Sequence, residues 1–382
     1  MAHDQEDGPR LSESAGAVFA VLAAAGSATR PQLAALAGLS KPTVSAAVAE
    51  LETASLAARS GTAHGTTGRS AAVYRLGPAA GCVLAVDLGS THTEVRGCAL
   101  DGTVLTARTT DARTRPADAL RHVLDALDGL PAGSPRAVVI AVPDVATDHD
   151  GSGPRPATPA IAAEVDALSL PPRIPVHIEN NVNCAALAEL HEGAARGRHT
   201  FGYLQVGYGI GLGIVVGGQV LRGSNGAAGE IARLPYPWAE DEESVHEGME
   251  RYAGAGALLR RVAAAWRAPQ DGPEPYDAAR LFALAAEGHP KARHFVDGHA
   301  REVGRLAAAA TAVLDPGLIV LGGGIGANPQ LLPGVRAELA RLSWPTEVVS
   351  SEVGDSGTVA GAARLAVARG IQTVTDGVPA KH

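Results

Sequence analysis

Residues 29–52 constrain the fold of this chain most strongly, because their apolar spacing fits two short helices joined by a tight turn. Gly38 is the expected turn residue, since a residue without a Cβ atom adopts positive φ at little cost. Ser40 is placed to cap the second helix, and Pro42 falls in its first turn. This is the pattern of a helix-turn-helix, which places its second helix in the DNA major groove. The alternative is an ordinary helical hairpin.

The residues on both sides extend this motif to a winged helix-turn-helix. Residues 12–25 have helical apolar spacing and end at a glycine, which predicts a preceding helix. Residues 56–60 and 72–76 are typical of two short strands around a polar loop, which would form the wing. We therefore predict a DNA-binding domain over residues 1–76, followed by a linker at 77–80.

The DNA contacts are expected from the second helix of the motif and from the wing. The apolar side chains expected to face inward are Val44, Ala47, Val48 and Leu51. The outer face is then small and polar, which suits short contacts to bases and phosphates. The candidate DNA-binding residues are Arg30, Ser40, Lys41, Thr43, Ser45 and Arg69. Arg69 is placed to enter a narrow minor groove, and the alternative is a solvated arginine.

Charge is distributed unevenly along the chain. Residues 1–76 contain six basic and six acidic residues, so the net charge of −8 belongs to the remainder. A DNA-binding domain with almost no net charge is expected to bind DNA phosphates with modest affinity. It therefore needs the avidity of a homodimer or homotetramer on a palindromic operator.

The composition excludes a membrane span and a disulfide framework. The most apolar long stretch, residues 307–325, is interrupted by Asp315-Pro316 and by three glycines. The N-terminal residues are acidic and polar, unlike a signal peptide. The three cysteines, Cys82, Cys98 and Cys184, are far apart, which predicts reduced core thiols in a cytoplasmic protein.

From Cys82 onward, buried strands alternate with helices, which predicts mixed α/β layers. The expected helices include one over 180–193 and a long one over 292–314. Three glycine-rich turns follow strands there: Asp87-Leu88-Gly89-Ser90-Thr91, the run Gly207–Gly213 and the run Gly322–Gly326. Glycine lets backbone N–H groups approach an anion, so each turn fits a phosphate, although each alone also fits a simple tight turn. The first two turns are expected to head two halves of a duplicated fold.

Polar residues at three further points are candidates for binding vicinal hydroxyls. Glu179-Asn180-Asn181 stands at a strand-to-helix junction, and Glu230 and Glu250 follow later. Amides and carboxylates make paired hydrogen bonds to such hydroxyls. For each residue taken singly, a helix cap or a solvated charge is the alternative.

Together these motifs resemble the ROK family, which groups repressors, open reading frames and sugar kinases. The resemblance rests on the N-terminal domain, the Asp87 turn, residues 178–186, residues 207–231 and the Gly322 turn. It implies a two-lobed, actin-like (RNase H-like) α/β fold with a sugar bound between the lobes.

The resemblance also assigns lobes and sites. The first lobe would span residues 81–195 and the second residues 196–382, with a C-terminal helix returning to the first. The implied effector contacts are Asn180, Asn181, Glu230 and Glu250. A vestigial nucleotide site is implied at Asp87, Gly89, Thr91, Gly209, Gly323 and Gly324.

Three departures from the family pattern bear on function. The family's kinases have Asp where this chain has Asn181, and that Asp is the base that takes the sugar hydroxyl proton. Loss of a general base costs about 10²–10⁴-fold in rate. The His and the cysteine cluster that bind structural zinc in the family are missing after Glu230, and no cysteine follows Cys184. Pro143-Asp144 replaces the family's Pro-Gly sugar loop.

We therefore expect a cytoplasmic, sugar-responsive transcriptional repressor without enzymatic activity, cofactor or zinc. Its partners would be operator DNA, a sugar or sugar phosphate between the lobes, and further copies of the chain. The first alternative is an ATP-dependent sugar kinase with an appended DNA-binding domain. The second is a regulator with a vestigial pocket that answers to a protein partner.

Overall fold

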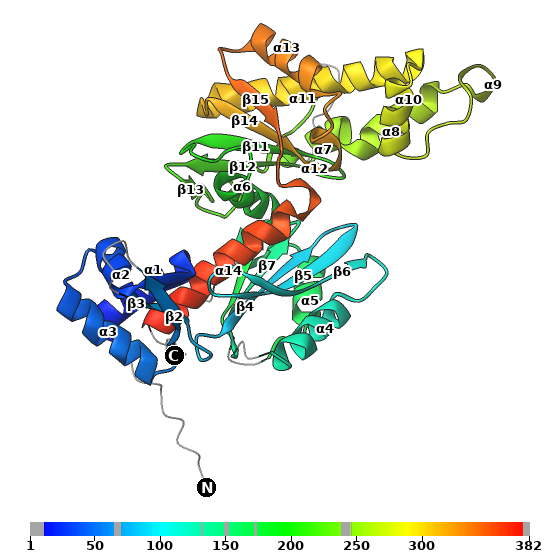
Figure 1. Ribbon diagram of the computed structural model, residues 1–382. Coiled ribbons are helices and arrows are strands. Elements are labelled where there is room, and N and C mark those ends of the chain that lie inside the picture. Colours follow the sequence, from blue (N-terminus) through cyan, green and yellow to red (C-terminus); the bar gives the residue numbers. More distant parts are fainter. Residues whose placement is uncertain are drawn as a thin grey trace. The chain divides into compact units, whose positions relative to one another are not determined.

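The computed structural model describes residues 11–64, 70–130, 133–148, 153–171, 174–237, 245 and 247–376 (Figure 1). The chain forms two compact units. Unit 1 contains the chain up to Val142, Thr158–Glu179 and the residues from Ala362 onward, and unit 2 contains Pro143–Ala157 and Asn180–Gly361. The chain therefore passes from one unit to the other four times.

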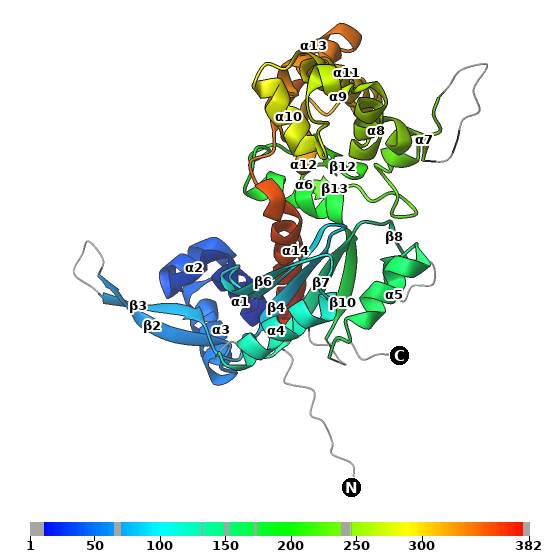
Figure 2. The same cartoon turned by 90° about the vertical axis from the view of Figure 1, so that its right-hand side faces the viewer.

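The N-terminal part of unit 1 consists of three helices and a three-stranded sheet. The helices are α1 (Glu13–Ala25), α2 (Arg30–Ala37) and α3 (Lys41–Thr53), and the strands are β1 (Ser27–Thr29), β2 (Ala57–His64) and β3 (Ser70–Leu76). The strand order is β1-β3-β2, and the β2–β3 hairpin extends away from the helices (Figure 2). Ser12 caps α1, and Ser40 caps α3. Gly38, with φ +64°, makes the predicted turn between α2 and α3.

These helices pack on the apolar residues that the sequence placed inside. The inward-facing side chains of α3 are buried, as predicted, and they are Val44, Ala47, Val48 and Leu51. Phe19 and Leu22 of α1 and Leu33 of α2 are fully buried beside them. The opposite face of α3, which carries Lys41 and Ser45, is exposed.

Hydrogen bonds fix the linker that joins this part to the rest of unit 1. The Gly77 N–H donates to the Leu56 carbonyl oxygen at 2.8 Å. From the other side, the Arg136 guanidinium donates to the carbonyl oxygens of Ala79 and Ala80. The linker is therefore bonded both to the helical part and to the sheet that follows.

A five-stranded sheet of order β10-β7-β4-β5-β6 forms the centre of the rest of unit 1. Its strands are β4 (Cys82–Leu88), β5 (His92–Ala99), β6 (Val104–Asp111), β7 (Pro135–Val142) and β10 (Val176–Asn180). Its helices are α4 (Pro116–Asp128), α5 (Pro159–Ala167) and most of α14 (Gly357–Asp376). The α14 helix packs on the sheet at Gly370, where a Cβ atom would lie 2.6 Å from Val83 Cγ1. It also packs on α1, where Thr375 lies beside Gly16.

Unit 2 contains a second five-stranded sheet, of order β13-β12-β11-β14-β15. The strands are β11 (Phe201–Val206), β12 (Ile210–Val216), β13 (Gln219–Val220), β14 (Leu318–Gly322) and β15 (Glu347–Ser350). A short sheet of β8 (Ala146–Thr147) and β9 (Arg155–Pro156) is also present. The helices are α6 (Asn181–His191), α7 (Gly248–Ala253), α8 (Ala255–Ala265), α9 (Ala268–Asp271), α10 (Ala278–Ala286), α11 (Pro290–Leu314), α12 (Gly323–Gly326) and α13 (Leu332–Leu342). Two 3₁₀ turns, η1 (Ile231–Arg233) and η2 (Gly354–Ser356), complete the unit.

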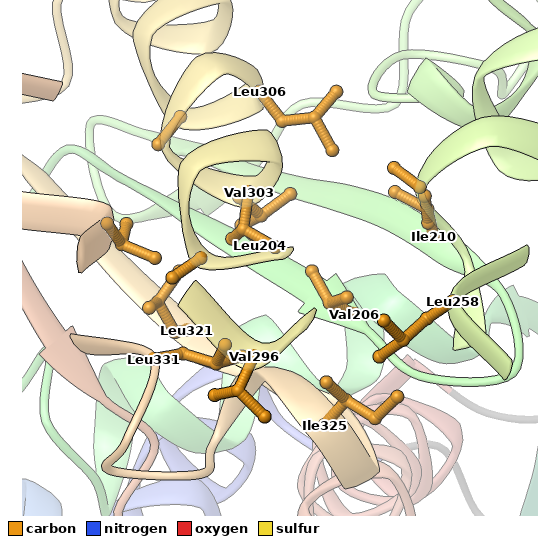
Figure 3. Packing of buried hydrophobic residues seen from close by; sticks show 14 of the residues in the cluster. Leu204, Val206, Ile210, Leu258, Val296, Val303, Leu306, Leu321, Ile325 and Leu331 are labelled. Atoms are coloured by element: carbon orange, nitrogen blue, oxygen red, sulfur yellow. The ribbon is translucent and has the colours of Figure 1, made fainter. Parts of the chain in front are cut away.

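Side chains alternate between the two faces of a strand. Both faces of this second sheet carry apolar side chains and are covered by helices. On β11, Leu204 and Val206 point to the cluster that α8, α10, α11 and α13 cover (Figure 3). Phe201 and Tyr203 point to the other cluster, which α6 covers with residues such as Ala186. The long helix α11 was predicted from the sequence over 292–314 and begins two residues earlier.

The two sheets have the same connectivity, as expected of a duplicated fold. In unit 1, the meander β4–β5–β6 is followed by β7, which pairs in parallel with β4. In unit 2, the meander β11–β12–β13 is followed by β14, which pairs in parallel with β11. The units divide at Asn180, whereas the sequence placed the lobe boundary after residue 195. The difference arises because α6 packs on β11 and β12.

No described helix is both long enough and apolar enough to cross a membrane. The cysteines Cys82, Cys98 and Cys184 are buried and unpaired with one another, as predicted for core thiols.

Candidate functional site

The N-terminal end of α3 presents four of the predicted DNA-binding residues. Ser40 caps the helix, and its Oγ lies 2.7 Å from the Thr43 hydroxyl and accepts from the Thr43 N–H at 3.3 Å. Lys41 and Ser45 are exposed, and Thr43 is half-buried. Because the buried side of the helix is apolar, these polar side chains share one accessible end. That end suits phosphate and base contacts.

The two remaining predicted DNA-binding residues, Arg30 and Arg69, are not residues of α3. Arg30 opens α2, and its Nη2 lies 3.5 Å from Glu52 Oε2. Its guanidinium also lies over the Tyr74 ring, 5.1 Å from the ring centre, so Arg30 makes contacts within the domain. Arg69 lies outside the described residues, and its role stays a prediction.

Three of the four predicted effector residues lie together in unit 2. Asn180 caps α6, because its Oδ1 accepts from the N–H groups of Val182 at 2.8 Å and Asn183 at 3.3 Å. Its Nδ2 donates to the Asp144 carbonyl oxygen at 3.1 Å and to the Glu230 carboxylate at 3.5 Å. Asn180 therefore caps α6, which was the alternative interpretation of this residue, and it also lies at the centre of a polar cluster.

Charged side chains complete this cluster. Arg233 lies on η1, three residues after Glu230, and its Nε is 3.4 Å from Glu230 Oε2. Its Nη2 is 3.9 Å from the buried Asp144 carboxylate. Glu250 on α7 accepts from the Ile210 N–H at 3.3 Å. We call Asp144, Asn180, Glu230, Arg233 and Glu250 the Asn180 cluster.

The electrostatics of the cluster are dominated by its carboxylates. Burial raises the pKa of Glu230, Arg233 lowers it, and the neighbouring charges of Asp144 and Glu250 raise it again. The cluster contains three carboxylates and one guanidinium, so it is negative when all are ionised. A ligand that brings hydroxyl or ammonium donors relieves this repulsion.

The fourth predicted effector residue, Asn181, is the first residue of α6 and is half-buried. Sequence reasoning noted Asp144 and Arg233 only as departures from a pattern. The i, i+3 spacing of Glu230 and Arg233 could have indicated their ion pair. No local signal brings Asp144 to them, because that contact depends on the tertiary fold.

The first glycine-rich turn, in unit 1, buries a carboxylate. Asp87 is 4% exposed, and its Oδ1 has no hydrogen-bond partner among the described residues. Burial, with the charge of Glu94 opposite it on β5, raises the pKa of Asp87 to about 7. His92 Nε2 lies 3.8 Å from Asp87 Oδ2. Gly89 permits the turn, because a Cβ atom there would lie 2.9 Å from the His92 carbonyl oxygen.

The other two glycine-rich turns lie side by side in unit 2. A Cβ atom on Gly207 would lie 3.4 Å from the Gly324 nitrogen. Gly323 has φ +81° and packs against the end of β11, where a Cβ atom would lie 2.7 Å from the Val206 carbonyl oxygen. Tyr208, next to Gly209, is 79% exposed at this point. The implied nucleotide residues Gly209, Gly323 and Gly324 are thus on adjacent turns, and Asp87, Gly89 and Thr91 share the turn of unit 1.

Comparison with known proteins decides the family. The sequence profile of the ROK family matches residues 83–369, which is most of the chain. The chain belongs to the ROK family.

Curated relatives of this ROK protein are named as kinases. It is 29% identical over 311 residues to a glucokinase of Aeropyrum pernix, a match that covers 74% of this chain and 96% of the relative. It is 31% identical over 194 residues to the bifunctional enzyme NanE/NanK of Brucella melitensis, covering 50% of this chain. The match spans only 35% of that enzyme's length.

Solved structures of two kinds resemble this ROK protein. A ROK family transcriptional regulator, described as a homologue of the E. coli MLC protein, matches with a TM-score of 0.70 at 21% identity. That match covers 95% of this chain and 98% of the regulator. The ROK hexokinase of Thermus thermophilus matches with a TM-score of 0.56 at 30% identity, covering 74% of this chain and 96% of the hexokinase.

Proposed function

We propose that this ROK protein is a sugar-responsive transcriptional repressor that binds a palindromic operator as a dimer or tetramer. The observation that carries the proposal is the N-terminal part of unit 1. Its three helices and β2–β3 hairpin have the order of a winged helix-turn-helix, and α3 leaves its polar N-terminal end exposed. The regulator-like fold extends over 95% of the chain, whereas the hexokinase-like fold covers 74%.

In this proposal α3 enters the major groove. Lys41 contacts phosphate, and Thr43 and Ser45 contact base edges. Arg69 in the wing reaches the adjacent minor groove. The small side chains of this face allow the helix backbone to approach the DNA closely.

The effector is proposed to bind at the Asn180 cluster. The cluster offers amide and carboxylate acceptors, which suit the hydroxyls of a sugar. Its excess of carboxylates over the Arg233 guanidinium favours a neutral or amino sugar over a sugar phosphate. Effector and operator binding would then be coupled by about 1–3 kcal/mol, or roughly 5–150-fold.

The kinase alternative has specific support in the kinase relatives and in Asp87, which keeps its place at the end of β4. Against it stands Asn181, because an amide has no basic lone pair to take a hydroxyl proton. The proposal therefore assigns sensing to this site, with no turnover.

The test uses a duplex selected from a random library by the purified full chain. Its fluorescence anisotropy is followed while glucose, glucosamine, N-acetylmannosamine and the 6-phosphate of each are added. We expect at least one unphosphorylated sugar to release the duplex and its 6-phosphate to be weaker. ATP-dependent phosphorylation of these sugars, lost in Asp87→Ala, would instead establish the kinase. Failure of the chain to select any duplex would refute the regulator.

A further inference from the structure

The resemblance implies structural zinc in the segment that follows Glu230, and the residues of this chain do not fit it. Arg233 occupies the position of the family's His, and a guanidinium offers no lone pair to a metal. Its nitrogens are instead directed to Glu230 and Asp144. The described part of the chain contains no group of three His, Cys, Asp or Glu side chains placed to hold a metal ion.

The segment is joined to α7 by contacts that need no metal. The rings of Tyr236 and Tyr252 lie 4.4 Å apart between centroids. The Met249 N–H donates to the Leu234 carbonyl oxygen at 3.2 Å. Gly248 packs so closely that a Cβ atom there would lie 2.3 Å from the Tyr236 carbonyl oxygen. The start of α7 is thereby fixed against the end of η1.

Two arginines of α8 bond the other end of α7: Arg260 Nη2 donates to the Arg251 carbonyl oxygen at 3.3 Å, and Arg261 makes the shorter contacts. Arg261 of α8 donates from Nη1 to the Tyr252 carbonyl oxygen at 2.6 Å and from Nη2 to Glu302 of α11 at 2.6 Å. Its guanidinium also lies 5.5 Å from the centre of the Tyr252 ring. The Glu302 carboxylate is 14% exposed and has His299 Nδ1 at 3.3 Å. Arg261 thus ties the last turn of α7 to two longer helices.

A helix of six residues is unstable alone, so its orientation depends on these contacts. Glu250 is two residues before Tyr252 on the same helix, and its carboxylate reaches the Ile210 N–H only while α7 keeps that orientation. The position of Glu250 relative to the rest of the Asn180 cluster therefore depends on the contacts of α7, which are made by residues outside the cluster.

We propose that Tyr236, Tyr252, Arg261 and Glu302 form a metal-free clamp that takes the place of the zinc site and positions Glu250 for the effector. The four are positioning residues, because they act through α7. Only the effector readout of this inference rests on the proposed function. Metal content and the opening of α7 can be measured without any ligand.

The experiment uses the purified full chain with and without prior dialysis against EDTA. We expect well below one zinc ion per chain by mass spectrometry, and an unchanged melting temperature after EDTA. Hydrogen exchange of the α7 amides, residues 248–253, should be unaffected by EDTA and faster by about tenfold or more in Tyr252→Ala and Arg261→Ala. One zinc per chain, or melting of α7 by EDTA, would overturn the clamp.

Conservative variants separate positioning from general damage. Tyr252→Phe keeps the ring and both Arg261 contacts and loses only the hydroxyl bonded to Tyr236, so its exchange should lie nearer the wild type than that of Tyr252→Ala. Arg261→Lys keeps the charge but loses the paired donation to Tyr252 and Glu302, so it should resemble Arg261→Ala. Arg280→Ala, which removes an exposed pair with Glu287, is the matched control and should change nothing. Wild-type exchange in both Tyr252→Ala and Arg261→Ala would refute the proposal.

The effector readout is then added. With the most active sugar of the panel, Tyr252→Ala and Arg261→Ala should need about tenfold more sugar for half-release while binding the operator as tightly as the wild type. Equal sugar midpoints in all variants would overturn the positioning of Glu250. If no sugar releases the wild type, the proposed function fails, and the exchange and zinc results still decide the clamp.

Discussion

Replacement of Asn180 tests the centre of the candidate site. In Asn180→Ala, α6 loses a cap that accepts two N–H groups, which costs about 0.5–2 kcal/mol. The Asp144 carbonyl oxygen loses its amide donor at 3.1 Å in a buried site, which costs about 1–3 kcal/mol. The sum predicts a decrease of about 1.5–5 kcal/mol in the stability of unit 2. Asn180→Ser keeps a capping oxygen and should lose only the second contribution, because serine is among the best N-caps.

Urea unfolding followed by tryptophan fluorescence measures this directly. All three tryptophans, at positions 238, 266 and 344, belong to the stretch that forms unit 2, so the signal reports that unit alone. Asn225→Ala, on an exposed loop of the same unit, is the matched control and should stay within about 0.5 kcal/mol of the wild type. Operator affinity should survive in Asn180→Ser while release by sugar is lost. An Asn180→Ala chain as stable as the wild type, or one released normally by sugar, would refute the assignment.

Three further changes test the other parts of the molecule. In anisotropy titrations, Lys41→Ala should reduce the slope of log affinity against log salt concentration by about 1. Thr43→Ala should weaken binding to the selected operator by about 1–3 kcal/mol. If both variants bind like the wild type, α3 is not the recognition helix. Because the pKa of Asp87 is raised to about 7 when folded, the folded chain binds more protons than the unfolded chain between about pH 4 and 7. Stability should fall by about 1.4 kcal/mol per pH unit as pH rises through that window, and Asp87→Asn should remove this slope in urea titrations followed by circular dichroism. Gly229 has φ +86°, and Gly229→Ala places a Cβ atom 1.8 Å from the Leu212 carbonyl oxygen. The variant should therefore melt several degrees lower and lose the sugar response. A melting temperature lowered by less than about 2 °C would contradict this.

Periodicity predicted the elements whose apolar faces are uninterrupted. The sequence placed α6 over 180–193, and the structure gives Asn181–His191, because Asn180 is the cap rather than a helical residue. By contrast, α13 was not predicted. It begins with Leu-Pro-Gly, and Gly334 is there because a Cβ atom would lie 2.6 Å from Ala300 on α11. A glycine that reads as a helix breaker in sequence is here a packing residue, which only the tertiary partner reveals.

The candidate site divides along the same line. Asn180 was predicted from a strand-to-helix junction, and Glu230 and Glu250 from the family pattern; the effector role of all three stays a prediction. Asp144 and Arg233 were found as departures from a pattern, and their roles became visible only when the fold brought them within 3.9 Å of each other. The clamp at Arg261 gave no sequence signal, because an arginine on an amphipathic helix is indistinguishable from a solvated one until its partners on other helices are known.

The position of the Asn180 cluster along the chain bears on how a ligand could act on α3. The chain passes between the units at four points, and Asp144 and Asn180 each stand within two residues of one of them. The bond from Asn180 Nδ2 to the Asp144 carbonyl oxygen therefore joins two of these crossings inside unit 2. A sugar that competes for Asn180 changes the bonding at the crossings themselves, whereas a ligand elsewhere in unit 2 acts only through packing. In the proposed function, a sugar that exchanges this bond acts at the segments that lead into unit 1, to which α3 belongs, and the loss of the same bond in Asn180→Ser should uncouple sugar binding from operator release.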